Sequence, residues 1–582
     1  MSRAQRAVSF IISQRKWLLM LVGFMTVLSV VGALRVGVDN AVEIWFPSDD
    51  PALAAYHDFL STFGNDEVVV IGVHSEGSML SDAALARVEA VGQAALTVDG
   101  IAQIRSIVTE PLVRGGDGTL EVSPISNGAD ARVAMMADPL AVSLVSSDQS
   151  TALVLAEMEA MSDIDARRDG ILADLQQAVR GVEPGATFAG IGIVYAALNQ
   201  ASTVDAAVVI VASYLLILVL LRLFMGRWQP VALTLCVVGL GATWLMGLYG
   251  GSGRSINMVT MVMPTLVLVI GVSDCVHMLV HVSSQPEDLP PVERVRRGVG
   301  AVIWPCLFNT LTTAMGFLAL STASMPVVQD LGVFCAVGLI AAFLGSTILC
   351  SIVAVLPAAL PRFEPSGVVQ RVVDGFAILA IEHPMKVLTV SAFVTLLAAI
   401  GVTRIEVDTY SIDFLYRDHP ARVDSERIEQ GFGPYTPLEF VVQNDSGVKS
   451  PEVLASISAW QDSMEDDSRV GWTRSLADVV ENLDRVMSGQ VRGRIPTDPT
   501  SIEQLLFLFE ADVDSDLPRF IDASETQTRV TVGVPMASAK QFGNVIDDLT
   551  DLAEFPDGTR VEPAGYIPLY VGIMDHIVSS QL

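Results

Sequence analysis

Three ionisable side chains, Asp274, His277 and His281, lie in one long apolar stretch. An ionisable group surrounded by hydrocarbon costs at least about a few kcal/mol, so by default it marks a functional site. Offsets of three and seven residues place the three groups on one face of a helix. A buried carboxyl beside imidazoles, which titrate near neutral pH, could pass protons. We therefore predict that Asp274, His277 and His281 form a proton relay.

The next apolar stretch carries polar residues that could support this relay. Asn309 and Thr313 share a helical face and, with Thr312, could hydrogen-bond Asp274. Polar residues that only pack helices together fit this pattern equally well. Two further alternatives to a relay role remain. Asp274 could be a structural polar group that bridges helices, and His281 could lie at the membrane interface.

The chemical alternatives to a relay find little support in the sequence. A metal held by the Asp and His side chains is disfavoured, because no third ligand lies at a matching depth. The five cysteines all fall in apolar runs, with neither a disulfide framework nor a zinc spacing. The sequence contains neither a P-loop nor an arguable Ser/His/Asp set. We expect no cofactor, no metal and no enzyme activity.

The composition indicates a membrane protein. The 582 residues are 51% hydrophobic and 17% charged, and the mean hydropathy is +0.50. A soluble protein of this length would need more charge to cover its surface. The net charge of -30 at pH 7 argues against a nucleic-acid partner, which would require clustered Lys and Arg.

Seven apolar stretches are long enough to cross a bilayer, which takes about 20 helical residues. Basic residues before the first stretch, with no acidic residue among them, place the N-terminus in the cytoplasm. A cleaved signal peptide is rejected, because the run is too long and no small-residue cleavage site follows it. The fourth stretch contains Pro264, which is expected to kink it, although helix packing explains this proline equally well. The predicted spans are Trp17–Leu34, Ala206–Phe224, Val231–Gly250, Ile256–His281, Ala301–Ala323, Val328–Leu356 and Val387–Thr403.

Two long polar regions, 38–205 and 404–582, are predicted outside the cytoplasm. The first carries 25 Asp and Glu against 7 Lys and Arg, typical of an acidic solvated surface. Each region reads as strand–helix–strand twice, which favours a ferredoxin-like, split βαβ domain. The predicted strands are 67–73, 101–108, 151–157, 186–190, 438–442, 470–473, 529–534 and 560–563, and the predicted helices are 82–96, 164–179, 453–464 and 541–552.

The sequence repeats itself at a large period. Residues 35–39 (Arg-Val-Gly-Val-Asp) match 404–408 (Arg-Ile-Glu-Val-Asp), and the same offset of 369 aligns the Phe-Gly pairs at 63–64 and 432–433. The repeat unit is therefore one span, an external α/β domain and five clustered spans. By this logic the next span begins near residue 581, and we expect about five more spans in the complete protein.

The fifth span supports a family resemblance. Asn309–Leu318 (Asn-Thr-Leu-Thr-Thr-Ala-Met-Gly-Phe-Leu) resembles the S-L-T-T-A-x-G-F signature of the MmpL-like branch of the resistance–nodulation–division superfamily, also seen in sterol-sensing domains. The run from Gly332 to Leu356-Pro357-Ala358 looks like the sixth span of that family. The position of Asp274 after Gly271 resembles the family's coupling aspartate, although Cys275 replaces the usual tyrosine.

The resemblance implies a multi-pass protein of the bacterial inner membrane that exports lipids or other hydrophobic small molecules in exchange for protons. A sterol- or lipid-sensing receptor without transport and a protein-export accessory are the alternatives. Expected partners are the hydrophobic cargo and membrane lipids, with a homo-oligomer and a periplasmic protein as further candidates. The predicted parts are 1–37 (N-terminus and first span), 38–205 (first porter domain), 206–360 (spans two to six), 361–386 (cytoplasmic linker), 387–403 (seventh span) and 404–582 (second porter domain).

Overall fold

The computed structural model describes residues 2–581, except 65–66, 110, 117–118, 126, 138–141, 160, 162–163, 356–366, 406–407, 465, 489, 491 and 511–516. The predicted Leu356-Pro357-Ala358 motif and the start of the predicted linker, 361–366, therefore lie outside the described residues. The chain divides into two compact units: 1–40 with 199–407 and 578–582, and 41–198 with 408–577.

The first unit is built of helices, and seven helices in the described part of the chain are long and apolar enough to cross a membrane. Each covers one of the seven stretches predicted from hydropathy. α8 begins fifteen residues before its predicted span, because it continues directly from the second unit. The helices are α1 (Arg3–Ser13), α2 (Arg15–Ala33), α8 (Ile191–Met225), α9 (Trp228–Gly251), α10 (Met263–Ser283), α11 (Pro291–Ala319), α12 (Pro326–Val353), α13 (Gly367–Glu382) and α14 (Pro384–Val402).

The start of α10 differs from the predicted fourth span. Ile256 lies outside the helix and forms an isolated parallel bridge with Val38. The side chain of Asn257 then accepts hydrogen bonds from the backbone N–H groups of Val259 and Thr260, at 3.0 and 2.9 Å, and the 3-10 turn η2 (Thr260–Val262) follows. Pro264 therefore occupies the first turn of α10, where its missing N–H costs nothing, and the predicted kink is wrong.

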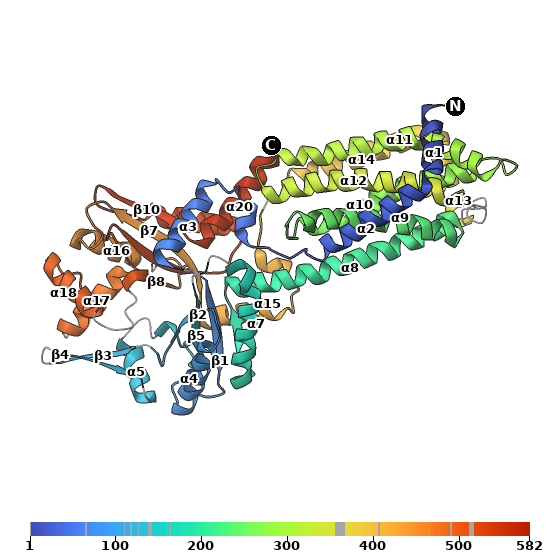
Figure 1. The fold of residues 1–582 in the computed structure, drawn as a ribbon. Helices are drawn as coiled ribbons and strands as arrows, with labels where there is room; N and C mark the ends of the chain where they lie inside the picture. Colours follow the sequence, from blue (N-terminus) through green and yellow to red (C-terminus); the bar gives the residue numbers. More distant parts are fainter. Residues whose placement is uncertain are drawn as a thin grey trace. The chain divides into compact units, whose positions relative to one another are not determined.

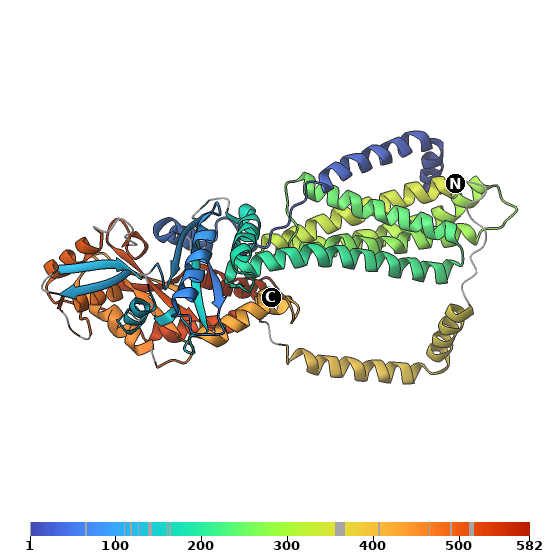
Figure 2. The same ribbon diagram turned by 90° about the horizontal axis from the view of Figure 1, so that it is seen from below.

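Small residues set the spacing of the bundle formed by α2, α9, α10, α11 and α12 (Figures 1 and 2). A Cβ built on Gly32 of α2 would lie 2.1 Å from the carbonyl oxygen of Gly247 on α9, and one on Gly247 would lie 2.2 Å from the Cα of Ser29. The backbones of α2 and α9 are thus in direct contact. Such close approach replaces the hydrophobic effect as the source of helix association in a bilayer.

The first sheet of the second unit has four antiparallel strands in the order β2-β5-β1-β6 (Figure 1). α4 (Asp82–Leu96) packs on β2 and β5 and against α7 (Ile164–Val182). Ser81 caps α4 by accepting the backbone N–H of Ala84 at 3.3 Å. The strands are β1 (Val68–His74), β2 (Ile101–Ser106), β5 (Thr151–Met158) and β6 (Thr187–Ala189).

The second sheet has the strand order β10-β7-β9-β8, also antiparallel. If the four strands of each sheet are matched in chain order, β1, β2, β5 and β6 correspond to β7, β8, β9 and β10. The two sheets then have the same strand order, read from opposite edges. The strands are β7 (Thr436–Asn444), β8 (Trp472–Ser475), β9 (Gln527–Val534) and β10 (Thr559–Ala564), with helices α16 (Pro451–Met464) and α19 (Ala539–Asp551). All of these lie within two or three residues of the predicted ranges.

Several elements of the second unit were not predicted. They include the hairpin β3 (Pro111–Gly116) and β4 (Thr119–Pro124) and the helices α5 (Gly128–Ala137), α17 (Leu476–Ser488), α18 (Pro499–Glu510) and α20 (Tyr566–Gln581). Besides η2, the described residues form the 3-10 turns η1 (Val42–Trp45), η3 (Leu320–Thr322), η4 (Ser411–Phe414) and η5 (Leu517–Arg519).

The two polar regions exchange a helix. α15 (Pro420–Phe432), from the second region, packs against β6 of the first sheet, where Ile428 is buried beside Val70 and Leu153. α3 (Pro51–Phe63), from the first region, contacts β10, and its Phe59 ring lies 5.3 Å from the guanidinium of Arg529 on β9. Each region therefore completes the other.

The α2–α9 contact generates the first testable prediction. Gly32→Ala should destabilise the protein by about 1–3 kcal/mol, because the new methyl group meets backbone that cannot move aside. Gly23→Ala on the same helix is the control: its Cβ would meet nothing within 4 Å. It should be neutral or stabilise by up to about 1 kcal/mol. The stability of both variants is measured by thermal unfolding in detergent, with a thiol-reactive dye reporting when the buried cysteines become accessible. Equal losses of stability in the two variants would contradict the helix packing described.

Candidate functional site

Asp274 lies near the middle of α10 and is 4% exposed. Its Oδ2 accepts a hydrogen bond from the hydroxyl of Thr310 on α11 at 3.0 Å. Its Oδ1 has no hydrogen-bond partner among the described residues. A buried carboxylate is stable only when several donors satisfy it, so one hydrogen bond leaves the charged form costly at this position.

Three helices meet at this carboxyl group. Cys306 on α11 lies within interaction range of Asp274. On the other side, the Cys275 thiol donates to the Ser346 hydroxyl of α12 at 3.2 Å. One turn earlier, a Cβ on Gly271 would lie 3.7 Å from the Cβ of Ala342, so α10 and α12 are in close contact. Cys275 thus contacts α12, and Thr310 supplies the hydrogen bond to Asp274.

The two predicted histidines do not contact this carboxyl group. His277 is exposed on the surface of the bundle, and His281 is half-buried with its Nδ1 3.0 Å from the carbonyl oxygen of His277. Within the described structure no hydrogen bond joins either imidazole to Asp274. No group of three or more His, Cys, Asp and Glu with the geometry of a metal site occurs among the described residues.

The predicted supporting residues on α11 face away from Asp274, so the expected hydrogen bonds were assigned to the wrong side of the helix. Asn309 and Thr312 are exposed. The hydroxyls of Thr312 and Thr313 each donate to the Asn309 carbonyl of their own helix at 2.9 Å. The residue in contact is the neighbouring Thr310, which is 3% exposed.

A sequence signal for Thr310 does exist. The buried residues of α11 recur every three or four positions and have small side chains, whereas the exposed residues have bulky ones. The buried set is Val299, Val302, Cys306, Thr310 and Ala314, and the exposed set includes Trp304, Phe308, Leu311 and Met315. Small residues favour helix contacts in membranes, so this pattern, rather than polarity alone, identifies the face that meets α10.

A second candidate site lies within the second unit, where α8 and α20 begin. The hydroxyl of Tyr195 on α8 donates to the hydroxyl of Tyr566 on α20, and the ring of Tyr566 stacks on that of Tyr570 at 6.0 Å. Burial raises the pKa of Tyr570 to about 12, so it stays neutral and donates to the Thr409 carbonyl at 2.7 Å. The guanidinium of Arg168, paired with buried Glu67, lies 5.6 Å from the Tyr195 ring.

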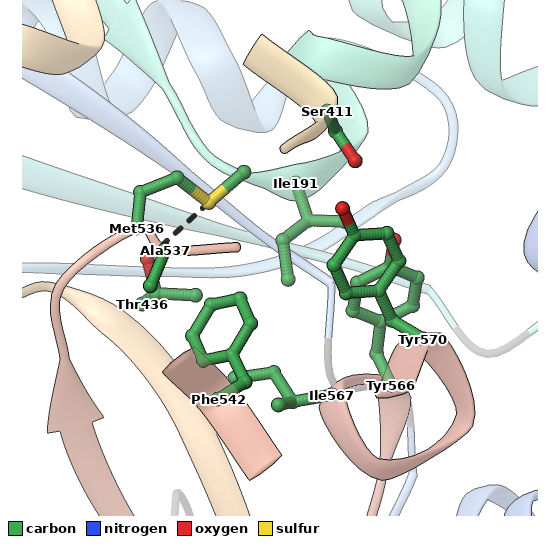
Figure 3. A pocket seen from close by; sticks show the side chains of 9 residues that line it. All are labelled: Ile191, Ser411, Thr436, Met536, Ala537, Phe542, Tyr566, Ile567 and Tyr570. Atoms are coloured by element: carbon green, nitrogen blue, oxygen red, sulfur yellow. Dashed lines mark hydrogen bonds between the residues drawn. The ribbon is translucent and has the colours of Figure 1, made fainter. Parts of the chain in front are cut away.

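Beside these tyrosines is a small apolar pocket lined from both polar regions (Figure 3). Ile191 comes from the first region and the other side chains from the second. Met536 accepts a weak hydrogen bond from the Thr436 hydroxyl at 3.8 Å. The remaining lining residues are Ser411, Ala537, Phe542, Tyr566, Ile567 and Tyr570. The pocket suits an apolar group better than a charged one.

Comparison with known proteins agrees with the bundle geometry. Residues 227–362 match the model of the sterol-sensing domain of SREBP cleavage-activation. That segment contains α9, α10, α11 and α12, and therefore Asp274 and Thr310. The chain is a membrane protein whose central bundle resembles a sterol-sensing domain. A protein of Methanocaldococcus jannaschii, named as a membrane protein, is 22% identical over 337 residues, which cover 55% of this chain and 85% of that protein.

The tyrosine pair generates the second prediction. Tyr566→Phe leaves the buried Tyr195 hydroxyl without this partner and should destabilise the protein by about 1–3 kcal/mol. Tyr195→Phe combined with Tyr566→Phe should restore much of that loss, because no hydroxyl then remains unsatisfied there. Thermal unfolding of the unmodified protein, Tyr195→Phe, Tyr566→Phe and the double variant measures the coupling. Additive losses in the double variant would contradict a direct hydroxyl–hydroxyl contact.

Proposed function

We propose that this protein is a proton-coupled transporter of the resistance–nodulation–division type, MmpL-like, that exports lipids or other hydrophobic small molecules across the bacterial inner membrane. The observation that carries the proposal is the carboxyl group of Asp274, buried in an apolar three-helix junction, where one of its oxygens has no hydrogen-bond partner in the described part of the chain. Such a group is costly when charged and cheap when protonated, which is the property a proton-coupling residue needs.

The proposed coupling step is a change in helix packing. Protonated Asp274 fits the apolar junction with Thr310 as its neighbour. Loss of the proton leaves a carboxylate whose burial costs several kcal/mol, and the junction must then open to water or supply donors. Because α10 and α12 contact each other through small side chains, such opening displaces whole helices rather than single side chains.

The second unit is proposed to handle the cargo. Its two sheets share one strand order, which supports the duplication read from the sequence and the assignment of two ferredoxin-like porter domains. The small apolar pocket marks where side chains of the two regions meet, and the cargo is proposed to pass between or beneath the two porter domains. In this proposal the two domains lie outside the cytoplasm, and the N-terminus lies inside.

A sterol- or lipid-sensing receptor without transport is the second candidate, favoured by the match of residues 227–362 to a sterol-sensing domain. The two functions differ in what they require of Asp274. A receptor needs a folded bundle that binds lipid, whereas a transporter needs a group that gains and loses a proton.

The test replaces Asp274 by Asn in the full-length protein. The amide keeps the size of the side chain and its contact with Thr310 but cannot titrate, so the protein should fold while proton-driven export falls to background. Asp330→Asn is the control, because it removes a carboxyl from the same bundle whose ion pair with Arg254 (2.8 Å) is partly exposed. It should retain export, since such pairs contribute only about 0–1 kcal/mol.

Export and proton entry are measured in proteoliposomes under an imposed pH gradient, with a fluorescent lipid as cargo and a pH-sensitive dye on the proton-receiving side. Export of the lipid against its gradient by Asp274→Asn would overturn proton coupling at this residue. Lipid binding without any transport by the unmodified protein would favour the receptor.

A further inference from the structure

The first helix of the chain, α1, is amphipathic and contains no acidic residue. Its buried side includes Ala4 and Val8, which are 4% and 0% exposed. The opposite side is exposed and contains Arg3, Arg6 and Phe10, at spacings of three and four residues. A short helix with one apolar side and one basic side is typical of helices that lie in the interface of a membrane.

α1 lies across the bundle rather than along it. In two views related by a 90° turn, α1 runs transverse to the long axes of α11 and α12 (Figures 1 and 2). The change of direction occurs at Gln14, which ends α1 with φ −93° and ψ 14° and precedes the first residue of α2. Because α11 and α12 are candidate spans, a helix transverse to them runs parallel to the plane of the membrane.

The contacts of α1 place it where α11 changes from polar to apolar. A Cβ on Gly300 of α11 would lie 3.1 Å from the Cγ of Gln5. Val8 belongs to the same buried cluster as Val299 of α11. The last charged residue of α11 is Arg297, and the rest of that helix is uncharged. In a membrane-spanning helix such a change marks the level of the lipid headgroups.

Exposed tryptophans mark the same level on two neighbouring spans. Trp17, at the start of α2, is 71% exposed, and Trp228, at the start of α9, is 59% exposed. The guanidinium of Arg222 lies 5.5 Å from the Trp228 ring. Tryptophan is enriched where a membrane meets water. The starts of α2, α9 and the apolar part of α11 therefore agree on one interface, and α1 lies at it.

The cations at this interface are not neutralised by the protein. The cations that precede the first span are all exposed, and they are Arg3, Arg6, Arg15 and Lys16. In the part of the chain that the structure describes, none of them forms an ion pair with an acidic side chain. The first acidic residue of the chain is Asp39, beyond that span. Arg297 of α11, by contrast, is paired with Glu293 at 2.7 Å.

We propose that α1 and the first turn of α2 bind the phosphate groups of anionic phospholipids, in the leaflet on the α1 side of the bundle. We call the exposed side chains of Arg3, Arg6, Phe10, Arg15, Lys16 and Trp17 the α1 surface. Its guanidinium groups match phosphate oxygens in charge and geometry, and its aromatic rings suit the boundary between headgroups and acyl chains. Basic clusters beside a span attract anionic lipids in this way.

This role differs from that of the proposed cargo, because the lipids hold α1 at the membrane surface and are not carried across it. The inference therefore goes beyond the proposed function and does not depend on Asp274. In the orientation proposed above, the lipids belong to the cytoplasmic leaflet.

The test uses the full-length protein in mixed micelles with equal amounts of phosphatidylglycerol and phosphatidylcholine. Native mass spectrometry counts the lipids of each kind that stay bound, and the unmodified protein should retain phosphatidylglycerol preferentially. Arg3→Gln combined with Arg6→Gln should lower that preference about twentyfold, since each cation near an anionic surface contributes a factor of about five. The control combines Arg35→Gln with Arg404→Gln, which removes two exposed arginines that follow α2 and α14. It should keep the preference.

Thermal unfolding verifies that both double variants are folded, as the exposure of all four side chains leads us to expect. An unchanged preference in the Arg3 and Arg6 variant, or an equal loss in the control, would overturn the proposal. Displacement of phosphatidylglycerol by inorganic phosphate at matched ionic strength would also overturn it, because the surface would then bind a free anion. Asp274→Asn should keep the preference even where export is lost, so this proposal and the proposed transport fail separately.

Discussion

The bundle is organised around the burial of one carboxyl group in an apolar interior. Asp274 is surrounded by small side chains and thiols, and Thr310 is its one hydrogen-bonding hydroxyl among the described residues. Most buried carboxylates in proteins are paired with a cation or several donors, because an unpaired charge costs several kcal/mol. Here the carboxyl group is 4% exposed, and α10 and α12 are in close contact beside it at Gly271 and Ala342.

Much of the architecture could be predicted from the sequence, because hydropathy and strand patterns report burial directly. The seven apolar helices and the eight strands of the two sheets fall close to their predicted ranges. The boundary at Ile256 and Pro264 was missed, because an apolar run does not show where a helix starts. Asn257, whose side chain caps two backbone N–H groups, is the local cue that decides it.

The site was predicted less well than the fold. Asp274 was identified because a charge within an apolar run is rare, but its partners depend on how helices are rotated. On α11, helical spacing groups Asn309 with Thr313, yet the packed face is the one with Cys306, Thr310 and Ala314. The histidines share the helix of Asp274 but not its environment, since His277 lies at the exposed surface. Rotation is set by side-chain size across the interface, which single-helix periodicity does not report.

The exchange of α3 and α15 between the two polar regions has a consequence for biogenesis. During synthesis the first sheet emerges long before α15, since six candidate spans (α8, α9, α10, α11, α12 and α14) and the helix α13 come between them in the chain. Until then the face with Val70 and Leu153 has no cover and is exposed to solvent. The first region must therefore wait in an incomplete state while the bundle inserts. Folding of the second region then completes both sheets together, so quality control of the second unit is a single late event rather than two successive ones.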